Sequence, residues 1–150
     1  MARDRDPQPL GDEAAARLFW TVGAAMAVVH VALAFHFKHA WSHAAAVADT
    51  ARQTQATLGF ALGEGVYVNY AFVVLWVADA FWWWLSPAGF RTRPAALDRA
   101  IRLFILFIFV NGAIVFPRGP VRVLGAITMV ALCLAWYRGR LGAGTRKVET

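Results

Sequence analysis

The segment from Leu18 to Phe37 constrains this chain more than any other, because it holds twenty consecutive residues without a formal charge. A helix needs about 20 apolar residues to cross the hydrocarbon core of a bilayer. A second run, Val66 to Leu85, is interrupted only by Asp79. The sequence therefore predicts at least two membrane-spanning helices.

The composition agrees with a membrane setting. Hydrophobic residues make up 59% of the 150 residues and charged residues 16%, against about a quarter charged in an ordinary soluble domain. The net charge is +6, but the basic residues lie in blocks between apolar runs, which indicates topology signals and contacts with anionic lipid. The lipid bilayer is the expected partner, and nucleic acid is not. The single cysteine, Cys133, allows no internal disulfide and no cysteine-based metal cluster.

Two shorter apolar runs follow, Leu103 to Phe116 and Val123 to Tyr137. Each gains a turn if the arginine at its start extends its side chain to the interface. Between them, Pro117 to Pro120 breaks any continuous helix and favours a tight hairpin. The predicted fold is all-α: one polytopic membrane domain, residues 1–150, with short disordered termini and four transmembrane helices at about 18–37, 66–85, 99–116 and 121–138.

The first helix is predicted to extend beyond the outer face of the membrane. No proline occurs between Pro9 and Pro87, and Ala44 to Leu62 is rich in helix-forming residues. Gly59 is the first residue of a glycine-containing stretch that could end such a helix.

The basic residues also indicate orientation. With the amino terminus inside, eleven of them fall on the cytoplasmic side and four outside, which is a positive-inside bias. The predicted location is a bacterial-type inner membrane, crossed several times, with both termini cytoplasmic. The inner set is Arg3, Arg5, Arg17, Arg91, Arg93, Arg99, Arg102, Arg138, Arg140, Arg146 and Lys147, and the outer set is Lys38, Arg52, Arg118 and Arg122.

A cleaved signal peptide is the alternative for the first span. The sequence Ala32-Leu33-Ala34 closes an apolar run and resembles a signal-peptidase site. Against cleavage, the leading segment is rich in acidic residues, whereas the start of a signal peptide is basic. We therefore expect residues 1–34 to remain.

Three histidines lie in the nine residues FHFKHAWSH, from Phe35 to His43. In a continuous helix their spacings of four and seven residues would place them along one stripe. Imidazoles spaced in this way can chelate a metal, and with a carboxylate nearby they suit copper, zinc or iron. The candidate metal ligands are His36, His39, His43, Asp49 and Glu64.

The alternative is that histidine, lysine and tryptophan occupy the wet end of a helix at the interface and bind nothing. Two functions thus stay open. One is metal handling or a redox accessory role at an outward-facing histidine-rich surface. The other is a non-catalytic structural or assembly subunit, in contact with other membrane subunits or with copies of itself. The sequence contains neither a nucleophile with a neighbouring base nor a phosphate-binding glycine loop, so no motif in it indicates an enzyme.

His30 lies inside the first span, on a stripe of small residues that marks close helix packing. Counted at about 1.5 Å per residue, Asn111 and Thr128 reach a similar depth, which predicts a buried polar layer of His30, Asn111 and Thr128. A haem within one chain is not expected, because every histidine belongs to the first helix or its extension. Met129 on the predicted fourth helix lies near the depth of His30, so a His30–Met129 ligand pair is the one arrangement that could hold a haem within a single chain.

Asp79 is the one formal charge deep inside a predicted span. A carboxylate at such a depth marks either a functional site or an ion pair. Arg102 lies at a comparable depth from the same side of the membrane. The sequence therefore predicts an intramembrane ion pair between Asp79 and Arg102.

Overall fold

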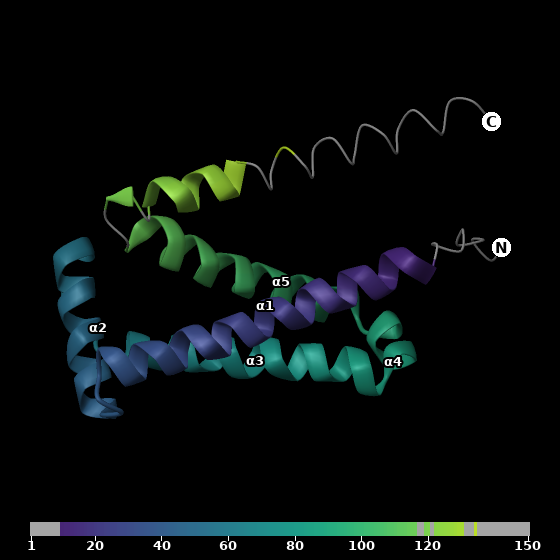
Figure 1. Ribbon diagram of the computed structural model, residues 1–150, viewed down its shortest axis with the longest axis horizontal. Coiled ribbons are helices and arrows are strands. Elements are labelled where there is room, and N and C mark those ends of the chain that lie inside the picture. The colour runs from purple at the N-terminus through teal and green to yellow at the C-terminus, as the bar shows by residue number, and fades with distance from the viewer. Residues whose placement is uncertain (1–9, 117–118, 121, 131–133, 135–150) are drawn as a thin grey trace. The chain divides into compact units, whose positions relative to one another are not determined.

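The computed structural model describes residues 10–116, 119–120, 122–130 and 134, and every regular element in them is helical. The all-α class is confirmed for this part of the chain. Residues 122–130 are also helical. Figure 1 shows α1 (Leu10–Phe37), α2 (His43–Leu58), α3 (Gly65–Leu85), α4 (Pro87–Thr92), α5 (Ala95–Val110) and the π-helical segment η1 (Asn111–Val115).

The chain divides into two compact units, Met1–Ile105 and Leu106–Thr150. In the first unit α3 is the central element, because α1, α2 and α4 all pack against it. Several predictions fall outside the described residues: the hairpin residues Pro117 and Arg118, Cys133, most of the fourth span beyond residue 130, and the disordered ends.

Helices α1 and α3 are each long and apolar enough to cross a membrane. The candidate span in α1 covers 25 residues from Glu13 to Phe37, and the 21 residues of α3 form the other. At 1.5 Å per residue, α3 measures about 32 Å, close to the 30 Å of a bilayer core. Only 6% of the apolar window of α1 and 17% of that of α3 is buried within the protein. A core helix of a globular domain would be mostly covered, so both helices remain candidates for membrane spans.

Within the described residues, no helix at the third or fourth predicted span is both long and apolar enough to be a candidate span. Helix α5 has 16 residues, about 24 Å, which is shorter than a bilayer core. It continues directly into η1, so residues 95–115 form one uninterrupted helical stretch. The four-span arrangement therefore stays a prediction.

The extended first helix was wrong, because α1 ends at Phe37. Ala40 and Trp41 have positive φ angles of 47° and 58°, which no α-helix contains. Ser42 then begins a new helix: its hydroxyl accepts a hydrogen bond from the backbone N–H of Ala45 at 3.2 Å, as an N-cap does. The outer segment therefore consists of a turn and a separate helix, α2.

A glycine allows α1 and α3 to approach closely. A Cβ atom on Gly23 would lie 2.6 Å from Cζ2 of Trp76, so the indole of α3 occupies the space beside this glycine. The same indole lies 5.3 Å from the ring of Trp20, centroid to centroid. Small residues at such crossings are typical of membrane helix pairs.

In the second unit, residues 122–130 pass close to η1. A Cβ atom on Gly125 would lie 2.2 Å from the carbonyl oxygen of Ala113, so only glycine fits at this crossing. The side chain of Arg122 donates a hydrogen bond to the carbonyl of Val115 at 3.0 Å. These contacts hold the two helical segments together on either side of the predicted turn.

Candidate functional site

The most buried charges of the described residues form an ion-pair network at the end of α3. The carboxylate of Asp79 accepts hydrogen bonds from Arg93 and, at 2.9 Å, from the indole N–H of Trp20. Arg93 also donates to Asp98, whose two oxygens each lie 3.0 Å from Nε of Arg102. The side chains of Asp79 and Arg93 are 1% and 3% exposed. The network therefore joins α1, α3, the end of α4 and α5.

The turn after α3 brings Arg93 into this position. Pro87 starts the short helix α4, and Pro94 follows Arg93. A residue before proline is restricted to extended backbone, and Arg93 has φ −58° and ψ 148°. Its guanidinium lies 3.8 Å from the ring centroid of Phe90, which in turn stacks on Trp83 at 4.4 Å. The stacked rings of Phe90 and Trp83 thus support the guanidinium of Arg93 beside the carboxylate of Asp79.

Arg93 replaces the partner that the sequence predicted for Asp79. The predicted pair of Asp79 with Arg102 is not formed, because Arg102 lies one turn after Asp98 on α5 and bonds to it. Counting depth along the helices took no account of α4, after which Arg93 reaches Asp79 of α3. The position of Arg93 before Pro94 indicated a turn, but it did not identify Arg93 as the partner of Asp79.

The three clustered histidines have separate environments. His36 contacts the rings of Phe37 and Trp41, with centroids 4.7 and 6.3 Å away. His39 packs edge-on against Phe35 at 5.5 Å. The helix break at residues 38–42 removes the stripe that the metal hypothesis required.

His43 lies between two tyrosines of α3. Its Nδ1 is 3.0 Å from the hydroxyl of Tyr70, and its Nε2 is 3.2 Å from that of Tyr67. Both ring nitrogens are therefore engaged in hydrogen bonds, whichever tautomer is present. This His–Tyr–Tyr contact joins the start of α2 to α3.

Neither of the two predicted carboxylate ligands forms a hydrogen bond with a histidine in the described residues. Asp49 binds Lys38 at 2.6 Å, Arg52 at 3.0 Å and the amide of Gln53 at 2.7 Å. Burial raises the pKa of Asp49, but the hydrogen bonds from Lys38 and Gln53 outweigh it and leave the pKa below its ordinary value. Glu64 precedes α3 without capping it through its side chain.

In the residues that the structure describes, no group of three or more histidine, cysteine, aspartate or glutamate side chains could hold a metal ion. The set His36, His39, His43, Asp49 and Glu64 is therefore not assembled as one site. Metal binding stays a prediction.

The predicted polar layer is divided between the two units. His30 belongs to the first unit and is exposed on α1, whereas Asn111 and Thr128 belong to the second. Asn111 donates to the carbonyl of Phe107 at 2.7 Å, and Thr128 to that of Leu124 at 2.9 Å. Their polar groups are thus satisfied within their own helices.

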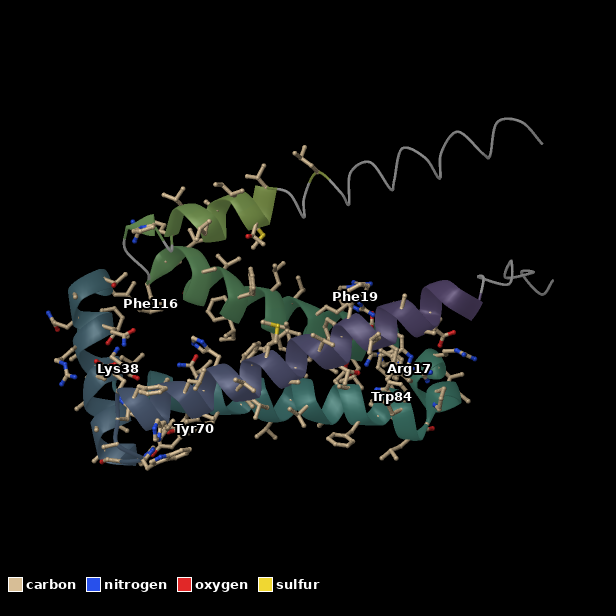
Figure 2. The ribbon with its side chains drawn as sticks, in the orientation of Figure 1. Arg17, Phe19, Lys38, Tyr70, Trp84 and Phe116 are labelled. Atoms are coloured by element: carbon tan, nitrogen blue, oxygen red, sulfur yellow. The ribbon has the colours of Figure 1, made fainter. Side chains whose placement is uncertain are left out.

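Figure 2 shows a further pair at the same end of the first unit, where Arg17 of α1 and Trp84 of α3 lie next to each other. The guanidinium carbon of Arg17 is 4.1 Å from the Trp84 ring centroid. The distribution of basic residues assigned Arg17 to the cytoplasmic side, but it did not predict a contact with Trp84.

Comparison with family models, with curated proteins and with solved structures gave no match.

Proposed function

We propose that this protein is a non-catalytic structural or assembly subunit of a membrane complex. It would lie in a bacterial-type inner membrane, cross it four times and have both termini in the cytoplasm. The observation that carries the proposal is the closed ion-pair network around Asp79. A carboxylate at this depth in a span is a candidate for proton or ion transfer. Here Arg93 and Trp20 already occupy its oxygens, so its charge serves helix packing.

The outward surface of the helices supports a partner role. Phe19 and Met26 on α1 and Val74 on α3 are exposed, as are most of the large apolar side chains of α1 and several of those of α3. Within the first unit little of this surface is covered, which supports contact with lipid or with other helices. A network that fixes the helices at one end and leaves long apolar faces outside suits a scaffold for other membrane chains.

The positive-inside distribution of arginine and lysine supports the proposed orientation. The uninterrupted helical stretch at 95–115 and the helix at 122–130 support a third and a fourth span. Metal handling at the histidine-rich segment is the weaker hypothesis. The helix break separates its ligands, and the tyrosines engage both nitrogens of His43.

The assembly role is tested by extracting the full chain from its native membrane into polymer-bounded discs, without detergent. We expect it to purify in a fixed ratio with other membrane chains or as an oligomer of itself. Asp79→Asn retains the shape of the side chain but removes its charge, and it should reduce both thermal stability and assembly. Recovery of a single copy alone, or a stable Asp79→Asn protein that assembles normally, would contradict the proposal.

A further inference from the structure

Arg17 of α1 forms no salt bridge with a carboxylate in the described residues, although the charge of Glu13 acts on it. Glu13 lies one turn earlier, but its two oxygens bind Arg91 at 2.8 and 3.0 Å. Asp79 and Asp98 are taken by the ion-pair network. The Nε atom of Arg17 is buried without a hydrogen-bond partner. The guanidinium of Arg17 therefore lies about two turns into α1 without a direct carboxylate partner among the described residues.

Hydrogen bonds hold the partner ring of Arg17 in place. The indole N–H of Trp84 donates to the hydroxyl of Thr21 at 2.8 Å, and that hydroxyl donates to the carbonyl of Arg17 at 2.8 Å. The guanidinium lies over the same indole. Because the ring is bonded to α1 itself, the cation is oriented in advance of any ligand.

Exposed apolar side chains lie close in the sequence to both members of the Arg17–Trp84 pair. Leu18 is 56% exposed, and Phe81, one turn before Trp84 on α3, is 61% exposed. Both lie within the candidate membrane spans. Arg17 thus sits where a charged group at the membrane surface and a hydrocarbon chain deeper in the bilayer could be bound together.

We propose that Arg17, stacked on Trp84, binds the phosphate of an anionic phospholipid whose acyl chain lies along Leu18 and Phe81. Charge complementarity selects the head group, since each basic residue near an anionic membrane surface contributes about a fivefold gain in binding. The exposed apolar side chains select a lipid over a free anion or an acidic protein segment. Tryptophan at this level is typical of the membrane interface.

The proposal rests on the membrane setting of α1 and α3 but not on the assembly role. A chain that purifies as a single copy would still bind the lipid. Failure to bind it would leave the assembly role untouched, so the two outcomes can be told apart.

The test uses the full chain, delipidated in detergent and titrated with phosphatidylglycerol or phosphatidylcholine, with lipid adducts counted by native mass spectrometry. We expect the wild type to bind phosphatidylglycerol about fivefold or more tightly than phosphatidylcholine. Arg17→Gln should abolish this preference. The matched control Arg52→Gln removes the same charge from α2, where Asp49 keeps Lys38 as a partner, and it should retain the preference.

An unchanged preference in Arg17→Gln would overturn the proposal, as would its loss in both variants. Displacement of the lipid by excess inorganic phosphate, or by an acidic peptide, would assign the site to that other ligand instead. If Arg17→Gln fails to fold by circular dichroism, Arg17→Lys replaces it. This variant keeps the charge but loses the planar stacking, and it should reduce the preference at least twofold. A preference equal to the wild type would count against the Arg17–Trp84 site.

Discussion

Removal of the Asp79 carboxylate would leave the guanidinium of Arg93 buried with only one of its two carboxylate partners, Asp98. The two side chains are 1% and 3% exposed, so water cannot replace the lost bonds without a rearrangement. Breaking a buried ion pair by removing one partner costs about 3–5 kcal/mol. Because Asp98 still accepts from Arg93, we expect about 3 kcal/mol for Asp79→Ala. Arg93→Ala should cost about 5 kcal/mol, since only Trp20 would then bond to the buried carboxylate.

Reversible unfolding in detergent micelles, followed by circular dichroism, measures these free energies. Arg102→Ala is the matched control: its side chain is 54% exposed, and the loss should stay within about 1 kcal/mol. The double variant Asp79→Leu/Arg93→Met should recover much of the loss, because apolar residues can replace a buried ion pair without cost. The reasoning fails if Asp79→Ala is no more destabilising than Arg102→Ala, or if the double variant loses the sum of the two single variants.

Three further predictions concern packing, pH and metal. Gly23→Ala should destabilise the protein by about 1–2 kcal/mol, because its Cβ atom would lie 2.6 Å from Trp76. The control Gly112→Ala should cost nothing, since a Cβ atom there has no neighbour within 4 Å. Equal free energies of unfolding for the two variants would refute this prediction. The pKa of Asp49 is lowered in the folded chain, so its contribution to stability should be complete above an unfolded pKa of about 3.9 and vanish as the pH falls through the folded value. The stability difference between wild type and Asp49→Asn should therefore shrink below about pH 4, and a constant difference would argue against the ion pairs. Purified protein should hold no stoichiometric copper, zinc or iron at neutral pH by elemental analysis; about one equivalent of metal, lost in His39→Ala or at a pH below about 6.5, would restore the metal hypothesis.

The spans of α1 and α3 could be predicted from sequence because hydropathy over twenty residues is a property of the chain alone. Leu18 to Phe37 and Val66 to Leu85 differ from the candidate spans in the structure only at their starts. The predicted apolar span ends at Phe37, but the helix was expected to continue beyond it, so the end of α1 at this residue was not predicted. Its cause could not be predicted either, since Ala40 and Trp41 adopt positive φ angles without a glycine to indicate a turn. Ser42 was the one sequence feature that indicated a new helix, because serine is a favoured N-cap residue and caps α2 here.

The ion pair was predicted in part. The burial of Asp79 and its need for a cation followed from its place in an apolar run. Its partner depended on the path of the chain after Leu85, where α4 turns Arg93 back toward α3. Helical rise gives depth but not direction around a helix, so Arg102 and Arg93 could not be distinguished from the sequence. The histidine stripe failed for a related reason, since a spacing of four residues has meaning only within one continuous helix.

The central claim is that α1 and α3 cross a membrane, with α2 outside and both termini in the cytoplasm. Site-specific labelling in intact cells tests it most directly. A membrane-impermeant thiol reagent is applied to single-cysteine variants at Gln53, Ala95 and Thr145, each in a Cys133→Ala background. We predict labelling at position 53 in intact cells, and at positions 95 and 145 only after the membrane is permeabilised. Protection of position 53 together with labelling of position 95 in intact cells would contradict the proposed topology, and labelling of all three would contradict the membrane spans themselves.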